Sequence, residues 1–147
     1  MEAHYYNVDL VWLNDRKGEI SSPELATVIE VATPPAFAKG IEFIWSPEHL
    51  LTAAVNSCFM TTFLAIAENS NLDFMEFRCE AKGKLEQVDS KFLITEVKLF
   101  PKLLLSNVND SEKAQRILQK SELACLVSNS IKAKVTLEPT IMLPENV

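Results

Sequence analysis

The sequence predicts an α+β fold in which a mostly antiparallel sheet packs around a long, buried central helix. Three observations support this fold class: a long apolar helical pattern after Ser46, segments of alternating apolar and polar residues on both sides of it, and a shorter helical pattern near the end of the chain. The chain has 147 residues, 48% of them hydrophobic. That is enough for one domain over residues 1–147 with its own core.

Two strands are expected before the long helix. Residues 5–13 are rich in β-forming side chains that roughly alternate, and residues 14–18 supply a polar turn. Residues 25–32 form the second expected strand. The next segment, residues 33–40, contains two prolines that cannot donate to a strand ladder, so we expect a loop there.

The long helix has a well-defined expected start. Ser46 can cap the free amides, Pro47 has the φ angle of a first helical residue, and Glu48 favours the positive end of the helix. Apolar residues then recur at spacings of three and four until residues 69–71. Because most of its circumference is apolar, we expect other elements to cover this helix. Polar residues interrupt the apolar run, so it is a poor membrane span.

Three strands and one helix are expected after the long helix. Residues 75–82 and 91–99 alternate and predict a hairpin, while Pro101 suggests an edge or a bulge in its second strand. Residues 109–125 offer several N-caps followed by a helical pattern that reaches Cys125. The clean alternation in residues 131–137 predicts the last strand.

Composition narrows the function classes. The chain has 20 acidic and 14 basic residues and a formal net charge of -6, which gives no electrostatic basis for binding nucleic acid. The N-terminus lacks the basic start and apolar run of a secretory signal, so we expect a cytoplasmic protein without a membrane partner. Three cysteines are an odd number, which favours redox chemistry over a structural disulfide framework.

The three cysteines differ in their surroundings. Cys79 lies on the apolar side of an alternating strand and is interpreted as a core residue. Cys58 lies among apolar helix residues, where the same interpretation would hold for that residue considered alone. Cys125 ends the second predicted helix, just before a segment suited to a turn. Spacing alone leaves a core role and a redox role for these two cysteines about equally supported.

Hydrolase and metal chemistry are poorly supported. The two histidines are His4 and His49, and His49 lies nine residues before Cys58 on the same predicted helix. That spacing places the two side chains on roughly opposite faces and about 13 Å apart along the axis, so they cannot form a nucleophile–base pair. No Cys or His pair has the spacing of zinc ligands, and neither a metal nor a cofactor is expected.

Two segments resemble signatures of the OsmC/Ohr family of thiol peroxidases. Residues 46–59, Ser-Pro-Glu-His-Leu-Leu-Thr-Ala-Ala-Val-Asn-Ser-Cys-Phe, resemble the helix of that family that starts with Pro-Glu-x-Leu and carries a cysteine. Residues 122–131 resemble its Cys-Pro-x-Ser signature, with Leu126 in place of the usual proline. The resemblance extends along nearly the full chain. It implies an OsmC-like fold, an intertwined homodimer with sites at the subunit interface, and reduction of organic hydroperoxides or hydrogen peroxide.

The resemblance also implies roles for four residues. Cys58 matches the peroxidatic cysteine and Cys125 the resolving cysteine, so a Cys58 sulfenic acid and then a Cys58–Cys125 disulfide are expected, with a small or protein dithiol as reductant. Glu48 matches an acidic residue that the family places near an arginine, and Arg16 is our candidate for that arginine. Two departures, Leu126 and the absence of a Gly-rich segment before the first helix, suggest a divergent OsmC-like branch. They keep an alternative open, a noncatalytic dimeric module that binds a small hydrophobic ligand.

Helix geometry adds a condition to this site. Glu48 and Cys58 are ten residues apart, roughly 15 Å along one helix, so they cannot serve one site within a single subunit. A dimer with antiparallel packing at these helices brings Glu48 to the partner's Cys58. A thiolate at Cys58 also needs a cation, because the positive helix end is too distant, and the Arg16 guanidinium can provide it.

Overall fold

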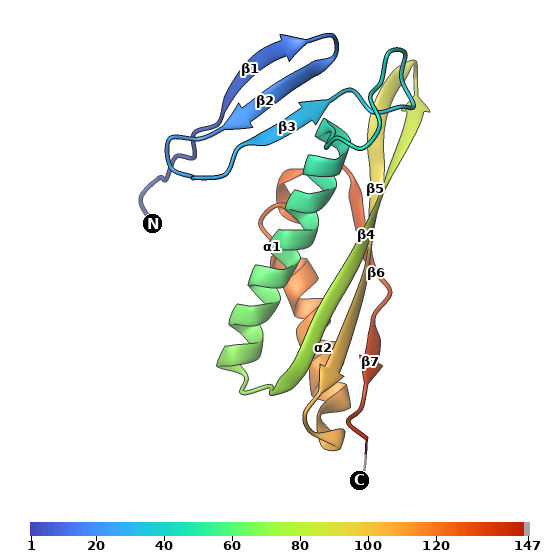
Figure 1. Ribbon diagram of the computed structural model, residues 1–147. Helices are drawn as coiled ribbons and strands as arrows, with labels where there is room; N and C mark the ends of the chain where they lie inside the picture. Colours follow the sequence, from blue (N-terminus) through green and yellow to red (C-terminus); the bar gives the residue numbers. More distant parts are fainter. Residues whose placement is uncertain (146–147) are drawn as a thin grey trace. The chain divides into compact units, whose positions relative to one another are not determined.

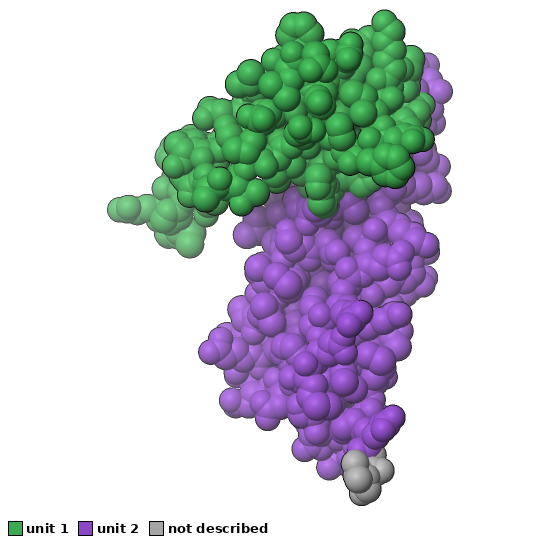
Figure 2. Space-filling view, viewed as in Figure 1, with its two compact units in different colours: residues 1–50 green, residues 51–147 purple. Residues whose placement is uncertain are grey.

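The computed structural model describes residues 1–145, which form two compact units. Figure 2 colours the first unit, residues 1–50, green and the second, from residue 51 onward, purple. Strands and helices occur in the order β1–β3, α1, β4, β5, α2, β6, β7. The predicted α+β class is therefore confirmed, whereas the single domain over residues 1–147 stays a prediction.

Unit 1 is built on a three-stranded antiparallel sheet. Its strands are β1 (Asp9–Asn14), β2 (Lys17–Ser21) and β3 (Ile29–Ala32), in the spatial order β1-β2-β3. All six residues of β1 are exposed, and Ala32 is the one hydrophobic side chain among the described residues of this unit that is buried. Unit 1 therefore has a hydrogen-bonded sheet but almost no core of its own.

The predicted turn over residues 14–18 was wrong in its length. Asp15, with φ 46°, and Arg16 alone connect β1 to β2, which begins at Lys17 and was missed. Gly18 lies in this strand, and a Cβ at this position would lie only 3.0 Å from the backbone oxygen of Val11 on β1. Glycine and charged residues resemble a turn in sequence, but here the glycine permits a close approach between strands.

Unit 2 contains a sheet of four strands and two helices. The strands are β4 (Phe74–Val88), β5 (Lys91–Leu105), β6 (Lys134–Leu137) and β7 (Thr140–Met142), and the helices are α1 (Pro47–Asn69), whose first turn belongs to unit 1, and α2 (Ser111–Ala124). β4 pairs with β5 antiparallel, and β6 and β7 pair with β5 parallel. Both helices cover one face of this sheet (Figure 1), where their apolar side chains join those of β5 in one core.

The β4–β5 hairpin is longer than predicted. Residues 83–90 were expected to connect the strands, but only Asp89 and Ser90, with φ 49° and 67°, lie between the last paired residues Val88 and Lys91. Positive φ at both positions is the geometry of a type I′ turn, which fits the twist of a hairpin. Residues 83–88 are mostly exposed and include Gly83, Lys84, Glu86 and Gln87, which is why the sequence resembles a loop there.

The sequence suggested that Pro101 marks an edge or a bulge, but the strand that contains it is not an edge strand. β5 is the central strand of the sheet, and Pro101 is fully buried within it. β5 pairs with β6 as far as Leu99 and with β7 from Lys102 onward. The proline thus occupies the gap between two partner strands, where no ladder N–H is required.

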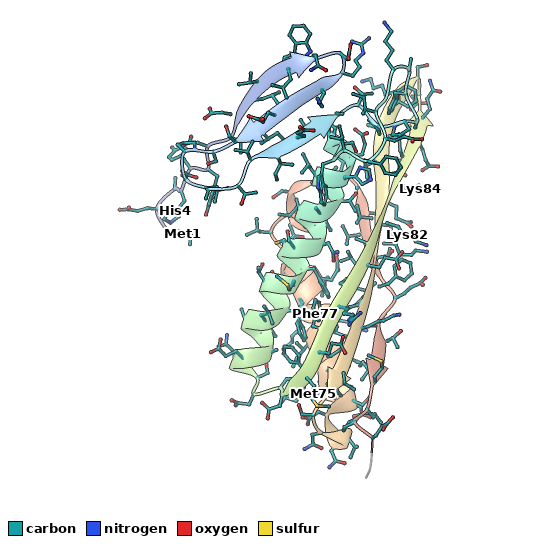
Figure 3. The ribbon with its side chains drawn as sticks, viewed as in Figure 1. Met1, His4, Met75, Phe77, Lys82 and Lys84 are labelled. Carbon is teal, nitrogen blue, oxygen red and sulfur yellow. The ribbon has the colours of Figure 1, made fainter. Side chains whose placement is uncertain are left out.

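The predicted long helix is confirmed, and one of its faces forms the centre of the unit 2 core. Its buried side chains recur every four residues, at Val55, Phe59, Phe63 and Ala67. Phe77 of β4 stacks on Phe63 with ring centroids 4.8 Å apart, and Figure 3 shows it beside the helix. These contacts fix α1 against the sheet.

Part of the remaining surface of α1 is apolar and open. Met60 and Leu64 are 39% and 41% exposed, although the helix carries apolar residues around most of its circumference. By length and composition alone α1 could cross a membrane. Its packing against β4 and β5 instead makes it the core helix of a folded unit with one face left uncovered in the single chain.

Candidate thiol site

Cys58 lies in the middle of α1, beside the buried residues Val55 and Phe59. Its side chain is half-buried, and its Sγ atom is 4.0 Å from Oγ1 of Thr62, one helical turn later. The sulfur therefore lies at the margin of the packed face of the helix. Protein groups surround it on one side, and it remains partly accessible on the other.

Cys125 approaches Cys58 from the end of α2. That helix buries Leu118 and Ser121 toward the core, and Cys125 continues the same face four residues later, at the C-terminal cap. The side chain of Cys125 is fully buried and lies near enough to that of Cys58 for each thiol to shift the pKa of the other. The structure thus brings together the two cysteines that the sequence analysis singled out, although 67 residues separate them along the chain.

The segment after α2 is a tight turn held by its own hydrogen bonds. Cys125 leaves the helical conformation with φ −64° and ψ 115°. The Asn129 N–H then donates to the carbonyl oxygen of Cys125 at 3.1 Å, and the Ser130 hydroxyl donates to that of Leu126 at 2.7 Å. The carbonyl groups of the turn are therefore engaged within it, while its first backbone amides lie beside the two sulfurs.

The surroundings of Cys58 favour a thiolate. Burial raises the pKa of this thiol, but contacts with the Cys125 thiol, the Val127 amide, the Thr62 hydroxyl and the Leu126 amide together lower it below its ordinary value. Each of these groups can donate a hydrogen bond to sulfur, and a donor stabilises the charged form. Cys58 is therefore the thiol of this pair that ionises more readily.

Cys125 has the opposite tendency. Burial raises its pKa, and the neighbouring Cys58 raises it further, while the side chain and amide of Ser128 partly offset both effects. The pKa of Cys125 is thus above its ordinary value, so Cys58 ionises before Cys125 as the pH rises. The pair is chemically asymmetric, since the pKa of one thiol is lowered and that of the other is raised.

Cys79 lies in a third environment. It packs against the core from β4, and burial raises its pKa to about 11 despite a backbone contact with Phe100. A thiol with so high a pKa has very little thiolate at neutral pH. The structure agrees with the interpretation of Cys79 as a core residue.

Unit 1 holds the other two predicted site residues. Arg16 is exposed in the β1–β2 turn and lines a pocket of about 220 Å³ together with Pro47, the first residue of α1. Glu48 follows in the first turn of that helix. Along α1, Glu48 and Cys58 are ten residues, roughly 15 Å, apart. Within the described residues, Cys58 and Cys125 therefore lie near each other in unit 2, and Arg16 and the start of α1 lie together in unit 1.

Sequence reasoning placed Thr62 beside Cys58, four residues later on the helix, and the structure confirms this neighbour. It missed two backbone groups. The amides of Leu126 and Val127 carry no side-chain signal, so no residue pattern could have revealed them. Within residues 1–145 the structure contains no cluster of three or more His, Cys, Asp or Glu side chains that could hold a metal ion.

Comparison with known proteins places the chain in a family. The model of the family described as OsmC-like protein matches residues 40–140. The Bacillus subtilis protein YmaD, described as uncharacterized, is 24% identical over 143 residues, which cover 94% of this chain and 93% of YmaD. The Escherichia coli peroxiredoxin OsmC is 28% identical over 93 residues, which cover 63% of this chain and 64% of that protein.

Solved structures of low sequence identity share the fold. An OsmC-like protein of Vibrio cholerae superposes with a TM-score of 0.84 at 19% identity, covering 93% of this chain and 99% of its own. An organic hydroperoxide resistance protein of Elizabethkingia anophelis superposes with a TM-score of 0.77 at 20% identity, covering 97% and 99%. With a family model that matches more than half of its length and this shared fold, the chain belongs to the OsmC-like protein family.

Proposed function

We propose that this protein is a thiol-dependent peroxidase in which Cys58 attacks a hydroperoxide and Cys125 resolves the product. The observation that carries the proposal is the proximity of two thiols whose pKa values are displaced in opposite directions, that of Cys58 downward and that of Cys125 upward. A peroxidase needs such a pair, because a thiolate attacks the peroxide and a second thiol must then react with the product. The family, which includes a peroxiredoxin, supports a peroxiredoxin-like role.

The reaction proceeds in three balanced steps. The Cys58 thiolate attacks one oxygen of ROOH, the O–O bond breaks, and the RO⁻ that leaves takes up a proton to become an alcohol, or water when R is hydrogen. The Cys58 sulfenic acid then condenses with the Cys125 thiol, which forms the disulfide and releases water. An external dithiol, small or protein, finally reduces this disulfide and is itself oxidised.

The proposed active form is a homodimer. The uncovered apolar side of α1 at Met60 and Leu64 and the exposed strand β1 support it, since both leave apolar surface that a second copy can bury. Antiparallel packing of two such helices brings Glu48 of one chain to the partner's Cys58. Arg16, oriented by Glu48, then supplies the cation beside the thiolate and donates to the peroxide oxygen. We place this enzyme in the cytoplasm.

A second candidate function is a noncatalytic module for a small hydrophobic ligand. An apolar pocket of about 480 Å³ in unit 1 favours it, lined by Pro35, Ile41, Phe43 and Trp45 among others. The volume suits a small molecule, and its walls are mainly apolar and aromatic. This module predicts that Cys58 stays unreactive toward peroxide, whereas rapid trapping of a sulfenic acid at Cys58 would favour the peroxidase.

A coupled assay with cumene hydroperoxide and dithiothreitol tests the proposal. We expect turnover in the wild-type protein that falls to background in Cys58→Ser, because serine cannot form the sulfenic acid. Cys79→Ser is the matched control, since it changes a half-buried thiol of the same unit, and we expect it to keep near-wild-type turnover. A folded wild-type protein that is no more active than Cys58→Ser contradicts the proposal.

A further inference from the structure

We propose that the apolar pocket of unit 1 binds small, uncharged aromatic molecules and that the His49 ring recognises a hydrogen-bond acceptor on them. The pocket, of about 480 Å³, is the one that favours the second candidate function. The inference rests on the ligand binding proposed there, whether or not Cys58 reduces peroxides, and it adds the chemistry by which the ligand is recognised. The residues that carry it lie between positions 35 and 49, all within unit 1.

Hydrogen bonds with Ser46 orient the His49 side chain in the first turn of α1. The His49 backbone N–H donates to Oγ of Ser46 at 3.1 Å, and the same oxygen lies 2.6 Å from Nδ1 of the imidazole. The ring also makes a T-shaped contact with Trp45, with ring centroids 6.2 Å apart. The imidazole is therefore oriented by the protein before any ligand binds.

The burial of Ser46 determines which ring nitrogen carries the proton. Ser46 is fully buried, and within residues 1–145 the acceptor that its hydroxyl contacts is Nδ1 of His49. A buried hydroxyl hydrogen without an acceptor is costly, so Ser46 donates to Nδ1. The neutral ring then has its proton on Nε2, where it is a hydrogen-bond donor. Because Ser46 is buried, its hydroxyl positions His49 and does not itself reach a ligand.

The Nε2–H donor of His49 is available to a ligand. No protein group within the described residues accepts a hydrogen bond from it, and the exposed His49 lines the pocket together with Ile41, Phe43 and Trp45. An aromatic molecule that carries an oxygen acceptor can satisfy this donor. The Glu42 carboxylate, which also lines the pocket, disfavours an anion, and the Nε2–H donor disfavours a cation. These groups together favour an uncharged ligand.

Phe43 supports a bound ligand independently of His49. Its φ is 66°, a conformation that bulky residues rarely adopt, and its side chain is fully exposed. Packing within the chain therefore does not offset the unfavourable backbone conformation at this residue. An aromatic ligand in the pocket can pack against the Phe43 ring and remove it from water, which stabilises this arrangement.

The test compares two probes of nearly equal shape, 2-phenyl-2-propanol and tert-butylbenzene, in which a methyl group replaces the hydroxyl. Trp45 lines the pocket and reports binding through its fluorescence, and Trp12→Phe removes the other tryptophan of the chain. We expect saturable binding of both probes. The alcohol should bind about 3- to 10-fold more tightly, which is the scale of one hydrogen bond.

Variants of His49 assign this preference to the ring. His49→Phe should abolish the preference while both probes still bind, because phenylalanine keeps a ring and lacks the donor. His49→Gln, whose amide can donate, should restore part of the preference, and His4→Phe is the matched control at the other histidine. Long-range proton–nitrogen NMR spectra should show the Nε2–H tautomer of His49 in the wild type and a mixture of tautomers in Ser46→Ala.

A preference that survives in His49→Phe, an Nδ1–H tautomer in the wild type, or the absence of saturable binding overturns the proposal. Equal binding of the two probes to the wild type also overturns it, while a hydrophobic-ligand module without recognition by His49 still stands. The comparison of probes in the wild type needs no variant of His49 or Ser46, so it decides even if such a variant fails to fold. Binding requires no turnover, so failure here leaves the peroxidase proposal standing.

Discussion

Cys58 and Cys79 are two half-buried thiols of the same unit, but different protein groups surround them. At Cys79 burial dominates, and one backbone contact with Phe100 leaves the pKa at about 11. At Cys58 burial also acts, but a thiol, a hydroxyl and two amides outweigh it and lower the pKa. The comparison teaches that the supply of free donors, and not the degree of burial, separates a reactive thiol from a core thiol in this protein.

The secondary structure explains why the donors differ. Cys79 lies in a paired strand opposite Pro101, where the backbone amides of the neighbouring residues belong to the β4–β5 ladder. Cys58 faces the end of a helix, where the chain turns and the first amides after Cys125 have no ladder partner. The turn after α2, and not the helix end itself, supplies these amides, because the C-terminal end of a helix leaves carbonyl groups without partners.

The largest expected effect is the difference in alkylation between the two thiols. Each unit by which a pKa exceeds the pH lowers the thiolate fraction tenfold, so Cys79, with a pKa of about 11, is about 0.01% thiolate at pH 7. We expect Cys58 to react with iodoacetamide at least about 100-fold faster at pH 7, because its pKa is below the ordinary value. The rate at Cys58 should rise and level off at a lower pH than that at Cys79.

Single-cysteine changes serve as controls for this comparison. Cys58→Ser should remove the fast phase and Cys79→Ser should leave it intact, with peptide mapping to assign each phase. Equal alkylation rates at the two thiols, measured in folded protein, would show that the groups around Cys58 do not activate it.

A smaller effect is expected from Arg16→Ala. If Arg16 supplies the cation beside the partner's Cys58 in the proposed dimer, its loss should slow the reaction of Cys58 with cumene hydroperoxide by about tenfold, and Arg16→Lys should restore part of the rate. Lys17→Ala is the matched control, since it removes a neighbouring cation that pairs with Glu30. A rate that stays unchanged in Arg16→Ala, or falls equally in Lys17→Ala, removes Arg16 from the site.

The sequence allowed most of the fold to be predicted, because periodicity and caps are local signals. The start of α1 at Pro47 and the helix that ends before Cys125 were predicted correctly, since Ser46 and the residues before α2 mark their boundaries. Strand β2 was missed because its glycine serves a close approach to β1, a tertiary requirement that resembles a turn. Pro101 suggested an edge because proline has no N–H for a ladder, and the gap between β6 and β7 that accommodates it is a tertiary feature.

The candidate site was predictable only in part. Helix periodicity placed Cys58 among core residues, and family resemblance rather than spacing suggested Cys125 as its partner. The amides of Leu126 and Val127 could not be predicted, because a backbone donor has no identity in the sequence and its direction depends on how the turn folds. The roles of Arg16 and Glu48 stay predictions, since they depend on a second copy of the chain.

The oxidation state of the three cysteines after one equivalent of cumene hydroperoxide tests the central claim most directly. Peptide mapping by mass spectrometry under nonreducing conditions measures it without knowledge of the physiological substrate or reductant. We expect a disulfide between Cys58 and Cys125 of one subunit, because their side chains lie near each other and a disulfide requires Cα atoms within about 7 Å, while Cys79 stays a free thiol. Oxidation of Cys58 to sulfinic acid with Cys125 still reduced, or no oxidation at Cys58 at all, would contradict the account.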